Sequence, residues 1–166
     1  MKYAVWISCV LLGSVLQAVL NNYLPVYLSP NLFLMFVMYM TFFYGYYTAV
    51  SAIIFISYLA SVFSSGNAWF YIFSYLFVFY LLNIFRKFFD RTQAAAVIVL
   101  AAVTTLMYPF IVLLPSIPLD KTSMFKAAVV LAVKQLPINM AAAYCLFKYL
   151  PSLSSRFKSA LNAQKV

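Results

Sequence analysis

The sequence places one lysine and two amide residues close together in an apolar segment near its C-terminal end. Lys134 is followed directly by Gln135 and, one helical turn later, by Asn139, all within a predicted helix over about Thr122–Phe147. At about 100° per residue, the two amides lie on the side of this helix opposite Lys134. An ammonium group binds anions and amides form hydrogen bonds, so Lys134, Gln135 and Asn139 are the candidate partner-binding residues.

Two interpretations of Lys134 stay open. A lysine inside a membrane helix is costly and should face protein, water or a partner. No acidic residue of this chain is expected at the same depth, which favours contact with an anionic group on a partner, a lipid or a ligand. Alternatively, Lys134 snorkels to the headgroups or hydrogen-bonds to carbonyls that Pro137 leaves unpaired.

The sequence offers little else for catalysis or metal binding. Its only carboxylates are Asp90 and Asp120, which fall in predicted loops on opposite faces of the membrane, and it has no histidine. General acid–base catalysis needs titratable groups in a shared pocket. The two cysteines, Cys9 and Cys145, sit in apolar segments near opposite ends of the chain. We therefore expect no enzymatic activity, no cofactor and no metal site.

Composition places the chain in a lipid bilayer. No charged residue occurs from Tyr3 to Phe85, and 67% of the 166 residues are hydrophobic while 8% are charged. Ordinary globular chains are roughly 45–50% apolar and 25% charged. The net charge of +9 could indicate nucleic acid, but the basic residues sit beside predicted helix ends, as the positive-inside rule describes. We expect no nucleic-acid partner.

Turn residues divide the apolar sequence into six predicted helices. A spanning helix needs roughly 20 apolar residues, so the fold class we expect is an all-α, polytopic bundle of six transmembrane helices over residues 1–150. A basic cytoplasmic tail over residues 151–166 follows. Residues 31–63 could instead form one long re-entrant hairpin. The predicted helices cover about Tyr3–Leu20, Asn31–Tyr44, Thr48–Phe63, Ala68–Phe85, Ala94–Leu114 and Thr122–Phe147.

The distribution of basic residues predicts the orientation. Six crossings put Lys2, the cluster from Arg86 to Arg91 and the basic tail on one side, and leave Lys121 with nearby Lys126 on the other. By the positive-inside rule both termini are cytoplasmic. Five crossings would separate the charged loop from the tail. The tail is predicted either as an interfacial amphipathic helix on anionic lipid or as a frayed basic segment.

A set of short motifs begins in the first predicted helix and ends after the fourth. The motifs are Leu16-Gln17, Leu24-Pro25, Pro30-Asn31-Leu32, Val37-Met38-Tyr39, Gly45, Ser64-Ser65-Gly66 and Ile84-Phe85-Arg86-Lys87-Phe88-Phe89. With these motifs, about two-thirds of the chain resembles the rod-shape-determining membrane protein family MreD.

The resemblance implies a non-enzymatic subunit of the bacterial cell-elongation complex, which builds peptidoglycan and maintains rod shape. Such a subunit lies in the inner (plasma) membrane among its lipids. It associates with the bitopic membrane protein MreC and, through it or directly, with the peptidoglycan synthase pair and the actin-like filament system. No catalytic residue is implied.

The same resemblance supplies an alternative function. The family is similar in fold to the membrane substrate-binding subunits of energy-coupling-factor vitamin transporters, which have six helices and a ligand pocket that opens outward. Those subunits usually carry small residues four apart in the first helix, and the nearest match here is Ala4 with Ser8. The alternative expectation is therefore a vitamin-binding membrane subunit.

Overall fold

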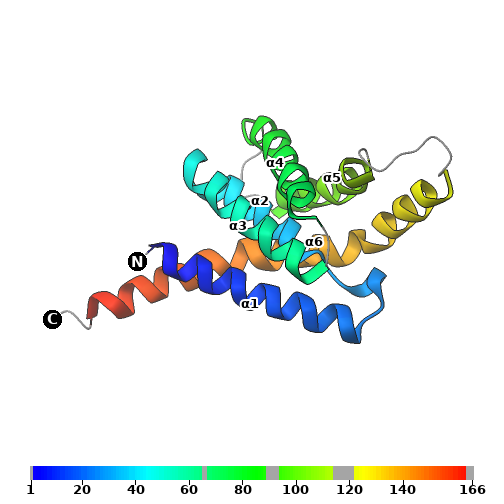
Figure 1. Cartoon of the computed structure of the whole chain (residues 1–166). Helices are drawn as coiled ribbons and strands as arrows, with labels where there is room; N and C mark the ends of the chain where they lie inside the picture. The colour runs from blue at the N-terminus through cyan, green and yellow to red at the C-terminus, as the bar shows by residue number, and fades with distance from the viewer. Residues whose placement is uncertain (1, 65–66, 89–93, 114–121, 164–166) are drawn as a thin grey trace.

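The computed structural model describes residues 2–64, 67–88, 94–113 and 122–163, and every regular element in these ranges is helical (Figure 1). The charged loops that hold Asp90, Arg91, Asp120 and Lys121 lie outside the described residues. The elements are α1 (Lys2–Tyr23), the short 3-10 helix η1 (Val26–Leu28), α2 (Leu32–Phe43), α3 (Tyr46–Ser64), α4 (Ala68–Phe85), α5 (Ala94–Leu113) and α6 (Thr122–Ala163).

Helix α2 is the centre of the fold. It packs against all five of the other α-helices, and nearly all of its residues are buried. Apart from Tyr39 and Thr41 its side chains are wholly apolar, and a helix that is hydrophobic all round has to be enclosed by protein or lipid. The Thr41 hydroxyl donates to the carbonyl oxygen of Val37 at 2.8 Å, so it adds no unpaired polar group to the core.

Within the part of the chain that the structure describes, three helices contain a stretch that is long and apolar enough to cross a membrane. These stretches are Tyr46–Ser64, Ala68–Phe85 and Lys126–Ser152, which is consistent with a membrane protein. Helix α2 has 12 residues and is therefore about 18 Å long, well below the hydrocarbon thickness of about 30 Å. The predicted second crossing, Asn31–Tyr44, is thus a short central helix and does not span a bilayer by its own length.

The predicted boundaries of the first five α-helices agree with the structure to within three residues, and α4 agrees at both ends. The sixth differs. Helix α6 runs on past the predicted end at Phe147, contains Pro137 and Pro151, and reaches Ala163 with 42 residues. No glycine follows Phe147 to end the helix at that point, and the helix also continues through Pro151. In Figure 1 α6 extends beyond the bundle, and its end lies on the same side as the start of α1.

Aromatic contacts show how α6 runs relative to α2. The ring of Phe147 packs edge-on against Tyr39, Phe42 and Phe43 near the C-terminal end of α2. Earlier in α6, Asn139 accepts a hydrogen bond from the backbone just before α2 begins. The two helices therefore run in the same direction.

Candidate functional site

The N-terminal end of α2 lies inside the protein, where its backbone N–H groups need acceptors. Three side chains supply them. The Asn31 side-chain oxygen accepts from the Leu34 N–H at 3.1 Å, the Gln17 side-chain oxygen accepts from the Leu32 N–H at 2.7 Å, and the Asn139 side-chain oxygen accepts from the Asn31 N–H at 2.8 Å. We call this group, with Asn21, Ser29 and Thr105, the α2 junction.

Further hydrogen bonds join the side chains of the α2 junction to one another. The Gln17 amide nitrogen donates to Asn21 Oδ1 at 2.9 Å and to Ser29 Oγ at 3.2 Å. The Ser29 hydroxyl donates to Asn21 Oδ1 at 2.6 Å. On the other side the Asn139 amide nitrogen donates to Thr105 Oγ1 at 3.2 Å. Because Gln17 and Asn139 are buried, these bonds fix α1, α5 and α6 relative to the start of α2.

The other end of α2 is held by a cation. Arg86, directly after α4, donates from Nη1 to the carbonyl oxygen of Thr41 at 3.0 Å and to that of Tyr44 at 3.4 Å. The last carbonyls of a helix lack partners and carry partial negative charge, so a guanidinium at this position stabilises the helix. Both ends of this short buried helix are thus capped by side chains from neighbouring segments.

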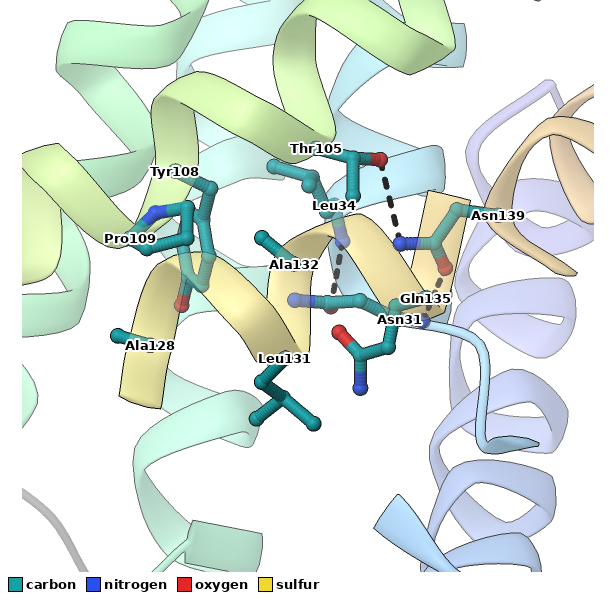
Figure 2. Close-up of a pocket in the computed structure, with 10 residues that line it drawn as sticks. All are labelled: Asn31, Leu34, Thr105, Tyr108, Pro109, Ala128, Leu131, Ala132, Gln135 and Asn139. Atoms are coloured by element: carbon teal, nitrogen blue, oxygen red, sulfur yellow. Dashed lines mark hydrogen bonds between the residues drawn. The ribbon is translucent and has the colours of Figure 1, made fainter. Parts of the chain in front are cut away.

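A cavity of about 200 Å³ opens beside the α2 junction. Its walls come from α2, α5 and α6, as Figure 2 shows. Pro109 on α5 faces two small residues of α6, Ala128 and Ala132, and their short side chains leave this space open. The Tyr108 hydroxyl, also at the wall, lies 3.4 Å from that of Tyr75. The ten described residues that line the cavity include no charged side chain.

The three candidate partner-binding residues do not form one site. Lys134 is exposed, with Nζ 5.8 Å from the centre of the Tyr27 ring. Gln135 lines the cavity, and its amide nitrogen lies 3.4 Å from the Ser29 carbonyl oxygen. Asn139 is buried in the α2 junction. The helical spacing correctly separated the lysine from the two amides, and whether any of the three binds a partner stays a prediction.

The roles of Gln17, Asn31 and Thr105 were not predicted from the sequence. Gln17 was noticed only as part of a family-like motif, and Asn31 as part of another motif and as the start of a predicted helix. Asn31 follows a proline and precedes an apolar run, which is a helix N-cap pattern. A glutamine inside an otherwise apolar helix is a second signal, because a buried amide needs partners. Thr105 carries no such signal, since a threonine in a membrane helix can bond to its own backbone.

The structure does not test the expectations about metal binding and acid–base catalysis. Among the described residues no three His, Cys, Asp or Glu side chains come together. Cys9 and Cys145 are free thiols. Both aspartates lie outside the described residues, so the expectations of no metal, no cofactor and no catalysis remain predictions.

The fold and the site define a helical protein that has three helices able to cross a membrane and a polar junction around a central short helix. Comparison with known proteins finds no match among protein-family models, curated proteins or solved structures. The proposal for function therefore rests on the sequence motifs and on the site itself.

Proposed function

We propose that this chain is a non-enzymatic integral membrane subunit of the bacterial cell-elongation complex, of the MreD type. The observation that carries the proposal is the α2 junction. Gln17 belongs to one motif that resembles MreD, and Asn31 and Leu32 belong to a second motif further along the sequence. In the structure Gln17 bonds to the Leu32 N–H, and Asn31 caps the same helix.

This convergence gives the motifs a shared physical reason. Short sequence similarities between apolar segments arise easily by chance, because such segments contain few residue types. Polar residues that close one buried hydrogen-bond network are constrained together, since losing one leaves a buried donor unpaired at a cost of about 1–3 kcal/mol. Because Gln17 and Asn31 take part in one network, the two motifs together support a shared architecture more strongly than either short motif does alone.

The orientation we propose is six crossings in the inner membrane with both termini in the cytoplasm. Arg86 caps the C-terminal end of α2, and Lys148 follows Phe147, which packs at that same end. Lys126 and Lys134 come before Asn139, which marks the opposite end. The basic residues at the Arg86 end, together with Lys87, outnumber those at the other end, which supports a cytoplasmic Arg86 end.

The short length of α2 is compatible with this proposal. Irregular backbone at membrane depth is tolerated where protein surrounds it. The start of α2 is bonded to Gln17 of α1 and Asn139 of α6, and η1 packs against α6 with the Tyr27 and Leu28 side chains exposed. In α6, the stretch from Lys126 to Lys148 is about 33 Å long at roughly 1.5 Å per residue, close to the hydrocarbon thickness of about 30 Å.

The partners we propose are a bitopic MreC-like protein and membrane lipids, with the peptidoglycan synthase pair and the actin-like filament system as further members of the complex. Lys134 is an exposed cation beside an aromatic ring, and on this proposal it meets an anionic group of the partner. The cavity beside the α2 junction, at about 200 Å³, is smaller than the roughly 300–1,000 Å³ of drug-sized ligand sites, so this cavity lends no support to the vitamin-binding alternative.

Co-purification tests the proposal. The tagged chain is expressed with an untagged MreC-like bitopic protein, or with an unrelated bitopic protein of similar size as the control. We expect the MreC-like protein to be recovered in stoichiometric amount and the control protein to be washed away. Equal recovery of both would refute the proposal, and a vitamin carried through purification at one equivalent would establish the transporter alternative.

A further inference from the structure

We propose that α6 binds the headgroup phosphate of an anionic lipid at the end of its apolar stretch. The site consists of the Lys148 ammonium and the side chains of Tyr144 and Tyr149, which we call the Lys148 cluster. This inference rests on the proposed crossing of α6 and not on the cell-elongation role, so it holds whether or not an MreC-like partner is recovered.

The Lys148 cluster lies where the apolar part of α6 ends. The stretch that is long and apolar enough to cross a membrane runs from Lys126 to Ser152, so Lys148 stands about one turn before its end. The Tyr149 side chain is 56% exposed, and tyrosines gather at the headgroup level because the ring is apolar and the hydroxyl polar. On the proposed crossing, the Lys148 ammonium is at the depth of the lipid phosphates.

Two tyrosine rings position the ammonium of Lys148. Its Nζ lies 5.4 Å from the centre of the Tyr144 ring and 5.5 Å from that of Tyr149, within the range of about 6 Å for cation–π contacts. The ammonium also donates to the Tyr144 hydroxyl at 3.4 Å, a long contact. An ammonium has three donors, and no acidic side chain occurs among the described residues. Lys148 therefore keeps donors for an anion.

The surface beside Lys148 indicates that this anion belongs to a lipid. The exposed face of α6 continues from Lys148 toward the middle of the apolar stretch through Cys145 and Ala141, which are both exposed and uncharged. A phospholipid matches this combination. Its phosphate can accept hydrogen bonds from the ammonium and from the Tyr144 hydroxyl, while its acyl chains cover the apolar face. A soluble anion would use the charged end alone.

The surrounding charge favours an anionic headgroup over a zwitterionic one. Phe147 packs at the C-terminal end of α2, the end that Arg86 caps, and Lys87 follows Arg86 directly. Beyond the cluster, α6 continues with Arg156 and Lys158 in its sequence and extends past the bundle (Figure 1). Basic segments beside a membrane attract anionic lipids, and they repel the cationic group of a zwitterionic headgroup.

Lipid titration of the purified full-length chain tests the proposal. Phosphatidylglycerol or phosphatidylcholine with identical acyl chains is added in detergent, and native mass spectrometry measures the bound fraction. We expect phosphatidylglycerol to bind at least about fivefold more tightly, with a smaller difference as the ammonium acetate concentration rises. Glycerol 3-phosphate, which has the phosphate without acyl chains, should not displace the bound lipid at equal concentration.

Four variants assign the effect to the Lys148 cluster. Lys148→Gln removes the charge and should weaken phosphatidylglycerol binding about fivefold, whereas Lys148→Arg keeps the charge and should retain binding. Tyr144→Phe keeps the ring without the hydroxyl and should give a smaller loss. Lys87→Gln is the matched control, because it removes one exposed positive charge near the same end of α2 and should leave binding nearly unchanged. Melting temperatures show that each variant is folded.

Three results would overturn the proposal. Equal weakening in Lys148→Gln and Lys87→Gln would mean that the overall positive charge attracts lipid without a defined site. Equal binding of the two lipids would contradict recognition of an anionic headgroup. Displacement by glycerol 3-phosphate would show a site for a soluble phosphate. None of these measurements needs an MreC-like protein, so their failure is distinct from a failed co-purification.

Discussion

Gly13 shows how a single missing side chain sets the distance between two helices. The Phe36 ring of α2 lies against the α1 backbone at this glycine, and a Cβ added at Gly13 would lie 2.8 Å from Phe36 Cζ and closer still to Cε2. The ring is part of the buried core, so it has little room to move. Close packing of this kind makes extra volume costly.

We expect Gly13→Ala to lower stability by about 1–3 kcal/mol, because the new methyl group forces α1 away from the Phe36 ring. Gly45→Ala is the matched control, since no atom lies within 4 Å of a Cβ built there. Thermal unfolding in detergent should show a drop of about 3–10 °C for Gly13→Ala and little change for Gly45→Ala. Equal melting temperatures would mean that α1 packs less closely than the structure shows.

Lys134 is a second single residue whose role can be tested. Because its side chain is exposed beside Tyr27, we expect Lys134→Leu to leave the melting temperature nearly unchanged and to reduce recovery of the MreC-like partner. Lys126→Leu, another exposed lysine of α6, serves as the control and should retain the partner. If Lys134→Leu recovers the partner as well as the unmodified chain does, the lysine only snorkels to the lipid surface and the contact hypothesis fails.

At the scale of elements, α2 is stabilised by side chains that belong to other segments. Its acceptors and donors at the two ends come from α1, α6 and the residue after α4. A short helix has a large share of unpaired backbone groups at its ends. Burial of this helix therefore depends on side chains that are distant in sequence.

We expect Asn139→Leu to destabilise the chain by about 1–3 kcal/mol, because it leaves the buried Asn31 N–H without its acceptor and removes the bond to Thr105. The control is Asn22→Leu, which replaces an exposed amide on α1. Hydrogen exchange of the amides at the start of α2 gives a local readout and should become faster in Asn139→Leu alone. Unchanged exchange would show that another group accepts from Asn31.

The positions of the elements were predictable because turn residues and apolar runs mark them. Asn67 before Ala68 is a helix N-cap, and its side chain accepts from the Trp69 N–H in the structure. Two properties were not predictable locally. The central position of α2 depends on packing by all the other α-helices, and α6 continues through Pro151 although a proline often ends or kinks a helix.

At the scale of the whole molecule, the cavity and the α2 junction could not be read from the sequence. Gln17, Asn31, Thr105 and Asn139 come from four different segments, and no spacing rule relates them. The sequence did show that these residues are rare polar groups among apolar ones, and such groups need partners once buried. Packing of α1, α5 and α6 around the start of α2 brings those partners together.

The proposed order of crossings leads to a test of topology. Residues near the C-terminal end of α2, where Arg86 binds, should lie in the cytoplasm. Residues near the N-terminal end of α2, where Asn139 binds, and those of α6 that precede Asn139 should lie toward the outside. Lys87 and Lys126 are both exposed and lie in these two groups. In a chain whose Cys9 and Cys145 are replaced by serine, we expect a membrane-impermeant maleimide to label Lys126→Cys in intact cells and Lys87→Cys only after lysis.

Reporter fusions give an independent measurement of the same property. A fusion after Arg91 should report cytoplasm and one at Pro118 should report the outside, because α5 connects the two positions. Helix α5 has 20 residues and is therefore about 30 Å long, and on the proposed arrangement it crosses the hydrocarbon region, which is about as thick. If both fusions report the same side, α5 does not cross, and the six-crossing arrangement is wrong. Opposite sides with an outside Arg91 would instead invert the orientation and contradict the positive-inside reasoning while leaving the crossings intact.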